Sequence, residues 1–464
     1  MGKTTNIMQG FAIKQAIKYL EKDPEKNMMK VLDMVDAAAP EGWYGSAREK
    51  VRKSLETKDN WYQLILKILQ LDPGVRNAFL ENFIFNSALR GSAILEESRE
   101  REGCNVPWAI LLDPTSACNL KCTGCWAAEY GHKLNLSLET IDSIICQGKE
   151  LGTRMYIYTG GEPMVRKKDL IKICEMHPDC QFLAFTNGTL IDEEFCQEML
   201  RVKNFVPAIS LEGFEEANDS RRGKGIYEKV QNAMKLLKDH KLPFGISTCY
   251  TSVNYSDISS EEFFDLMIDA GALFVWFFHY MPVGQGAVPE LLPTPEQRTV
   301  VYERIRSYRN SKAIFSMDFQ NDAEYVGGCI AGGRNYLHIN AAGDVEPCVF
   351  IHYSNANIHE CTLLEALKSP LFMAYKENQP FNGNMLRPCP MLENPEKLRA
   401  MVKETGAKST DYESPEDVDT LCDRTTPYAE NWKPQAEYLW NKHVVTWVDV
   451  LGVSMNKGLR ELIN

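Results

Sequence analysis

Six short apolar runs, each separated from the next by a segment of mostly helical periodicity, constrain the fold of this chain more than any other feature. The intervening segments are long enough for the crossover connections that parallel strands require. The runs lie at 107–112, 154–159, 181–186, 205–211, 244–250 and 273–280. We therefore predict an α/β protein with a partial, open (β/α)6 TIM-like barrel, whose reactive groups come from the loops that follow the strands.

The remaining sequence divides into segments on either side of this barrel. Before it, Trp61, Ile65 and Ile68 recur at helical spacing. After it, a Gly-rich region with scattered cysteines precedes an amphipathic stripe that includes Trp440 and Trp447. The predicted domains are a helical N-terminal domain at 1–104, the barrel at 105–320, a cysteine-rich domain at 321–435 and a C-terminal amphipathic helix at 436–464.

Charge and cysteine usage exclude several classes of protein. A formal net charge of -12 disfavours a general polyanion-binding surface, so we expect no nucleic-acid partner. Residues 1–30 lack the unbroken apolar stretch of a signal peptide or membrane span. The 14 cysteines are then better explained by reduced thiols, metal ligands and core packing than by disulfides, and we expect a cytoplasmic protein.

Three cysteines fall within eight residues directly after the first apolar run. Cys118, Cys122 and Cys125 form a loop short enough to hold three corners of one iron-sulfur cube. Because four-iron clusters usually take four thiolates, three cysteines leave one iron open to a ligand that is not protein. The alternative is a zinc site completed by His132, which does not account for the strand and helix pattern or for the glycine loop after the second run.

The C-x3-C-x2-C motif after the first predicted strand, followed by Gly160-Gly161-Glu162 after the second, resembles the radical S-adenosylmethionine (SAM) superfamily. The resemblance covers about 105–320 as the barrel. It implies a 4Fe-4S cluster whose open iron is chelated by SAM, and reductive cleavage of SAM to a 5'-deoxyadenosyl radical. The chain is thus predicted to be a radical SAM oxidoreductase or transferase.

The resemblance also implies contacts to the cofactor from loops that follow the strands. Gly160 and Gly161 would let the backbone approach the methionine end closely, and Glu162 would accept a hydrogen bond from its ammonium group. Ser210 and Glu212 match the position that binds the ribose hydroxyls.

Two further contacts to the cofactor depend on residues next to these loops. Arg222, in an Asp-x-x-Arg-Gly element, is predicted to face the carboxylate of SAM, with Arg221 as the competing candidate. The family often has an aromatic residue before the third cysteine, where this chain has Gly124, so we predict that Trp126 replaces that contact. The sequence identifies no residue as a proton or hydrogen relay.

A second set of cysteines lies near the C-terminus. The spacing Cys329-x13-Gly-x4-Cys348 predicts a hairpin that brings two thiols together, and it resembles the SPASM or twitch extension that carries auxiliary iron-sulfur clusters. Cys389 and Cys422 would complete one auxiliary 4Fe-4S cluster, with Cys361 as the other candidate for the fourth ligand. A zinc ribbon is the alternative that four thiolates would equally satisfy.

The substrate is the least constrained part of this prediction. By resemblance, peptide or protein modification, or the formation of a carbon-carbon or carbon-heteroatom bond, is expected. The apolar helices instead favour a lipid or hydrophobic small molecule, with a possible membrane contact. An electron donor such as a flavodoxin or ferredoxin is implied in both cases. A different class of function is an iron-sulfur electron-transfer or sensor protein that does not cleave SAM.

Overall fold

The structure is a computed structural model that describes residues 19–451 except residue 21 and residues 39–44. Within this part of the chain, nine strands form one sheet in the order β7-β6-β5-β4-β3-β2-β1-β8-β9. Strands β1 to β7 pair in parallel, β8 pairs in parallel with the other edge of β1, and β9 is antiparallel to β8. The strands are β1 (Ala109–Leu112), β2 (Met155–Tyr158), β3 (Gln181–Thr186), β4 (Phe205–Ser210), β5 (Gly245–Tyr250), β6 (Phe274–His279), β7 (Phe315–Asp318), β8 (Tyr336–Ile339) and β9 (Val345–Glu346).

Each of the six predicted apolar runs contains one of the strands β1 to β6, so the predicted parallel α/β architecture is confirmed. Strand β7 was not predicted, because its four residues include Ser316 and Asp318 and form no apolar run. The helices that connect the strands are α7 (Leu138–Leu151), α8 (Lys167–Met176), α9 (Glu193–Val202), α10 (Glu215–Arg222), α11 (Ile226–Asp239), α12 (Tyr255–Ile258), α13 (Glu261–Ala270) and α14 (Pro295–Arg309), with short 3-10 turns at Trp126–Tyr130, Pro163–Arg166 and Pro289–Leu291.

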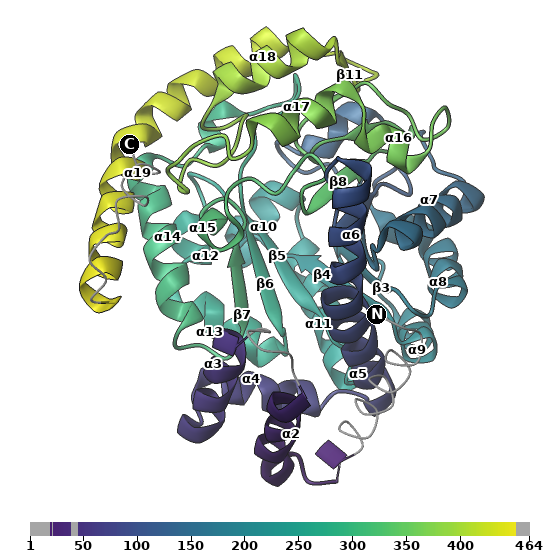
Figure 1. Cartoon of the computed structure of the whole chain (residues 1–464), viewed down its shortest axis with the longest axis vertical. Coiled ribbons are helices and arrows are strands. Elements are labelled where there is room, and N and C mark those ends of the chain that lie inside the picture. Colours follow the sequence, from purple (N-terminus) through teal and green to yellow (C-terminus); the bar gives the residue numbers. More distant parts are fainter. Residues whose placement is uncertain (1–18, 21, 39–44, 452–464) are drawn as a thin grey trace.

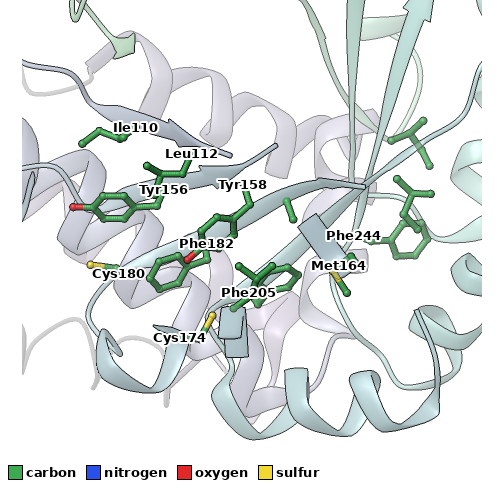
Figure 2. Close-up of a cluster of buried hydrophobic side chains, with 14 of the residues drawn as sticks. Ile110, Leu112, Tyr156, Tyr158, Met164, Cys174, Cys180, Phe182, Phe205 and Phe244 are labelled. Atoms are coloured by element: carbon green, nitrogen blue, oxygen red, sulfur yellow. The ribbon is translucent and has the colours of Figure 1, made fainter. Parts of the chain in front are cut away.

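Alternate side chains of the strands enter two different cores. Ile110 and Leu112 point outward and pack with aromatic side chains of β2 and β3 beneath the outer helices (Figure 2). There the rings of Tyr158 and Phe182 stack with centroids 5.8 Å apart. Ala109 and Leu111, the intervening residues of β1, face inward with side chains of the C-terminal region. This period of two, in strands buried on both faces, leaves the inner face of the barrel for the site.

Helices from the N-terminal region lie across the ends of the strands where β6 and β7 begin (Figure 1). Asp59 caps α4, and the next residue, Asn60, donates hydrogen bonds to the carbonyls of Arg309 and Lys312 at 3.1 and 3.0 Å. Lys67 of α4 reaches the carbonyl of Ile268, 3.2 Å away. The prediction of a helical N-terminal region is confirmed for the described residues, as α2 (Pro24–Ala38), α3 (Gly45–Thr57), α4 (Asn60–Leu69), α5 (Pro73–Phe79), a π-helical segment (Leu80–Gly91) and α6 (Ser92–Glu102).

The C-terminal region covers the opposite end of the barrel (Figure 1). Its elements are α15 (Ala323–Val326), β10 (Tyr353–Ser354), α16 (Leu363–Leu367), α17 (Pro370–Asn378), α18 (Pro395–Thr405), β11 (Lys408–Ser409) and α19 (Val418–Leu451). Trp432 of α19 is fully buried, donates to the carbonyl of Leu386 at 2.8 Å, and lies 4.1 Å beneath the guanidinium of Arg298. Helix α19 thus begins earlier than the helix predicted at 436–464, of which residues 452–464 lie outside the described part. None of the helices in the described ranges combines the length and hydropathy of a membrane span.

A buried ionic network joins the C-terminal region to the barrel where β1 meets β8. His338 of β8 contacts Asp113 through Nε2 at 2.8 Å and Glu346 of β9 through Nδ1 at 2.6 Å. Tyr130 donates to the same glutamate at 2.8 Å. Burial alone would lower the pKa of His338, but Asp113 and Glu346 outweigh it and raise the pKa to about 10.

The raised pKa of His338 makes the stability of this junction dependent on pH. Because its pKa rises from 6.5 to about 10 on folding, its protonation stabilises the fold fully below pH ~6.5, and this contribution is lost as pH rises towards 10. We expect the difference in unfolding free energy between the parent and His338→Gln to be largest near pH 6 and to shrink progressively by pH 10. Urea titrations across this range measure it, with the exposed His132→Gln as control; a difference independent of pH would contradict it.

Candidate functional site

A cavity of about 1080 Å³ occupies the inner face of the barrel. It exceeds the ~300–1,000 Å³ of typical small-molecule pockets, so it has room for more than one ligand. The loops after β1, β2, β3 and β4 all contribute to its wall, in agreement with the expectation that functional groups come from the loops that follow the strands. Residues of the C-terminal region also contribute to the wall.

The loop between β1 and Trp126 brings three thiols to the cavity. Cys118, Cys122 and Cys125 are half-buried, free of disulfides and part of the cavity lining. The loop follows β1 directly in the chain. The amide of Thr123 donates a 3.0 Å hydrogen bond to the carbonyl of Arg221, which joins the loop to α10. Burial raises the pKa of Cys118 to about 11, so ligation of a metal would release protons. Three thiols of one loop facing one cavity fit an iron-sulfur cluster with an open corner.

The zinc alternative requires His132 as a fourth ligand beside the three cysteines. His132 is exposed and lies outside the lining of the cavity that the three cysteines share. The structure therefore does not bring to the cavity the fourth zinc ligand that the sequence offered.

The two glycines after β2 are required by packing within the protein. A Cβ atom on Gly161 would lie 2.3 Å from the carbonyl oxygen of Ala117, and one on Gly160 would lie 2.7 Å from that of Thr115. The amide of Glu162 donates to the same Ala117 carbonyl at 2.8 Å. Both glycines line the cavity, and in this structure the segment that approaches them closely is the cysteine loop.

Glu162 joins the loops after β2 and β3. Its buried carboxylate accepts hydrogen bonds from the amide of Met164 at 2.9 Å, the hydroxyl of Thr186 at 2.7 Å and the amide of Asn187 at 2.7 Å. Burial raises its pKa, and these three donors oppose the shift. Glu162, the predicted acceptor for the ammonium group of SAM, therefore already accepts three hydrogen bonds that hold the loops after β2 and β3 together. Its two oxygens still have lone pairs for a further donor.

Glu212, at the end of β4, pairs with both candidate arginines. Its fully buried carboxylate contacts Arg221 at 2.8 Å and the Nε atom of Arg222 at 3.0 Å, and accepts from the amide of Cys249 at 3.1 Å. Arg221 and Arg222, the two candidates for the carboxylate of SAM, therefore both pair with the same glutamate. Ser210 is half-buried beside it on the cavity wall.

Trp126 lies between the barrel and the C-terminal region. Its ring meets those of His338, Phe350 and His352 edge-on, with centroids 6.0 to 6.1 Å apart, while another part of it lines the cavity. Tyr280 lies over Gly124, the position where the family often has an aromatic residue, and its hydroxyl lies 2.6 Å from where a Cβ on Gly124 would stand. Sequence reasoning missed Tyr280, because only the fold brings the segment after β6 over the cysteine loop.

The C-terminal cysteines divide into two groups. Cys329, Cys348 and Cys389 line the same cavity as the first three thiols, and Tyr336 contacts the sulfur of Cys348 at 2.6 Å. The predicted hairpin that places Cys348 is confirmed as β8 and β9. Cys422 instead lies in the core of α19, and its thiol donates to the Pro395 carbonyl at 3.3 Å without being part of the cavity lining.

The other candidate for the fourth ligand, Cys361, likewise donates to a backbone carbonyl, that of Asn357 at 3.3 Å. Cys361, like Cys422, lies outside the lining of the cavity. The structure therefore brings three of the five candidate thiols to the cavity, and three thiols fit an iron-sulfur cluster with one open corner.

In a comparison with known protein families, residues 112–271 match the model described as the Radical SAM superfamily. The Fe-coproporphyrin III synthase of Methanosarcina barkeri is 29% identical over 248 residues, which cover 51% of this chain and 60% of that protein. The PqqA peptide cyclase of Gluconobacter oxydans is 26% identical over 66% of this chain and 89% of its own length. Streptococcus suis SuiB bound to S-adenosylmethionine shares the fold, with a TM-score of 0.55 and 19% identity over 69% of this chain and 79% of SuiB.

The contact of Gly161 with the cysteine loop can be tested by adding one methyl group. Because Gly161→Ala would place Cβ against the backbone oxygens of Ala117 and Ser116, we expect the loop to be displaced and the iron bound by the loop to fall by at least half. Iron content after anaerobic reconstitution, with the electron paramagnetic resonance of the reduced protein, measures this. Gly45→Ala, with no atom within 4 Å of the added Cβ, is the control; full iron loading in both variants would refute the packing role.

Proposed function

The chain carries a radical SAM domain over residues 112–271, and from that premise we propose that it is an enzyme that abstracts hydrogen from a substrate held in the barrel cavity. Cys118, Cys122 and Cys125 would hold the 4Fe-4S cluster that binds SAM. When bound, the cluster and SAM together supply one-electron chemistry that generates a carbon radical from SAM. The observation that carries the proposal is that both cysteine sets, from sequence segments about 200 residues apart, line one cavity.

The chain's own residues bind and orient the cofactor. Ser210 and the cluster of Glu212, Arg221 and Arg222 form the cavity wall beside the cysteine loop. We assign the arginines to the carboxylate of SAM, because guanidinium groups match that geometry, and Ser210 to a ribose hydroxyl. Glu212 would hold the two arginines in place, and Glu162 would position the rim rather than act on the substrate.

We also propose that Cys329, Cys348 and Cys389 hold an auxiliary cluster. The three thiols line the same cavity as the first loop, whereas Cys422 donates to a backbone carbonyl outside it. A three-cysteine site leaves one iron corner open to the cavity, where substrate can bind or deliver an electron. This arrangement favours an oxidation of the substrate over simple electron transfer.

Peptide modification is a second candidate for the overall activity. A relative is described as a PqqA peptide cyclase, and the fold is similar to that of SuiB, which has been solved bound to the precursor peptide SuiA with a TM-score of 0.53. The iron-porphyrin names of other relatives favour a small molecule instead. All 14 cysteines are free of disulfides, which fits a reducing compartment such as the cytoplasm. There, a flavodoxin or ferredoxin would supply the electrons. Lys121 and Thr123 of the cysteine loop are exposed and would lie near the donor.

Loss of one thiol of the first loop distinguishes a radical enzyme from a redox protein. We expect Cys118→Ala to abolish formation of 5'-deoxyadenosine from SAM, because the cluster loses one of three ligands, while the C-terminal cluster keeps its spectrum. Chromatography of anaerobic reactions with dithionite measures the product. Cys146→Ala, on the exposed face of α7, should behave as the parent; a parent that forms no 5'-deoxyadenosine, with or without cell extract, would favour a sensor or electron-transfer role.

Matched variants of two C-terminal cysteines test the ligands of the auxiliary cluster. We expect Cys348→Ala to lower the iron content by roughly one cluster and to impair product formation while some cleavage of SAM persists. Cys422→Ala should retain the iron of the parent, because its thiol lies outside the cavity. Iron analysis and Mössbauer spectra report both; equal losses in the two variants would return Cys422 to the ligand set.

A further inference from the structure

The cavity continues from the cysteine loops down to helix α4 in the N-terminal region. Residues at spacings of three and four on α4 contribute to its lining: Trp61, Leu64, Ile65 and Ile68. These residues form one face of the helix. The N-terminal helices therefore provide the floor of the cavity that holds both cysteine sets.

Between this floor and the rim, the wall is dominated by apolar side chains. Leu111, Ile157, Phe185 and Phe278 face the cavity from four strands, and Trp276 lies 5.1 Å from Phe185, centroid to centroid. Closed eight-stranded barrels fill this space with layers of side chains, whereas here it remains hollow. Strands of four to six residues at ~3.3 Å each give the hollow a depth of roughly 13–20 Å.

The cavity opens to solvent through an apolar mouth beside α3, α4 and β7. Five of the large exposed hydrophobic residues in the described chain line this cavity: Val51, Trp61, Phe315, Tyr325 and Val326, which are 37 to 60% exposed. The rings of Trp61 and Phe315 pack directly against each other at its edge, with centroids 5.8 Å apart. Lys50, exposed on α3, also lines the cavity here. Exposed apolar residues gathered at one opening mark a binding site rather than scattered surface.

We propose that this hollow binds the apolar chain of an amphiphilic substrate, which enters tail-first through the mouth and runs along α4 towards the cysteine loops. The proposal rests on the function proposed above and names its substrate class. An anionic head group would stay at the mouth near Lys50, so the carbon-hydrogen bond that breaks would lie in the chain, far from the head. Its hydrogen atom would pass to the 5' carbon of the deoxyadenosyl group.

The lining favours such a chain over the other substrate classes. An extended peptide carries one amide and one carbonyl per residue, and each needs a hydrogen-bond partner when buried. The wall between floor and rim offers mainly hydrocarbon and aromatic surface. A methylene chain gains about 0.8 kcal/mol per buried CH₂ in such surroundings and needs no polar partner.

A substitution on α4 tests whether the chain runs along this helix. Because a chain of either length would pass Ile65 after entering at the mouth, Ile65→Trp would narrow the path, and we expect the reconstituted full chain to bind both hexadecanoic acid and decanoic acid at least tenfold more weakly than the parent. The parent should bind hexadecanoic acid more tightly than decanoic acid, because the longer chain buries more methylene groups. Gln63→Trp, on the exposed face of α4, is the control. Displacement of a fluorescent fatty acid gives the dissociation constants, and melting temperatures report folding.

Other probes separate the possible sources and the competing ligands. Binding to phosphatidylglycerol vesicles, but not to free hexadecanoic acid, would identify a lipid surface as the source; the reverse would identify a diffusible amphiphile. Equal affinity of the parent for both acid lengths, or a folded Ile65→Trp variant that binds like the parent, would overturn the proposal. So would coproporphyrin III binding more tightly than the fatty acid and independently of residue 65.

Cleavage of SAM in the same samples keeps this test separate from the proposed function. Formation of 5'-deoxyadenosine without chain-length-dependent binding would sink the substrate assignment alone. Chain binding without any cleavage of SAM would sink the radical function and leave a lipid-binding cavity.

Discussion

The direct packing of two backbone segments fixes the geometry of the site. The loop that carries Cys118 lies against the glycines after β2, where Gly161 and Glu162 donate amide hydrogen bonds to the carbonyls of Thr115 and Ala117 at 3.1 and 2.8 Å. Only residues without a Cβ permit this approach. The carboxylate of Glu162 also accepts hydrogen bonds from Thr186 and Asn187 at the end of β3. The loops after β1, β2 and β3 are therefore joined by hydrogen bonds, and the cysteine loop is part of this connected set.

A second connection links this unit to the C-terminal region. Trp126 follows Cys125 directly and packs edge-on against Phe350, two residues after Cys348. Below it, His338 bridges Asp113 and Glu346 in the interior. Buried charges of this kind cost solvation unless each is paired, so the network specifies one docking arrangement of the two regions. Both cysteine sets consequently line one cavity between the barrel and the C-terminal region.

The strands and the cysteine loop could be predicted from the sequence because both are local signals: apolar runs at regular intervals, and three thiols within eight residues. Strand β7 could not be predicted, because Ser316 and Asp318 interrupt its apolar residues and leave no apolar run. The pairing of Glu212 with two arginines, the placement of Tyr280 over Gly124 and the separation of Cys422 from the cavity depend on contacts between distant segments. Sequence spacing alone cannot reveal these contacts. The same holds for α4, because apolar residues at helical spacing are typical of core packing, and only the structure shows that those of α4 line the cavity.

The parallel pairing of β8 with β1 has a consequence for how the chain can be divided. All four residues of β1 are hydrogen-bonded between β2 and a strand that comes more than 200 positions later. A barrel fragment that stopped near residue 320 would leave β1 as an exposed edge strand. All four residues of β1 are apolar, so no charged side chain would discourage association with other chains. The barrel and its cysteine-rich extension therefore have to be expressed and engineered together.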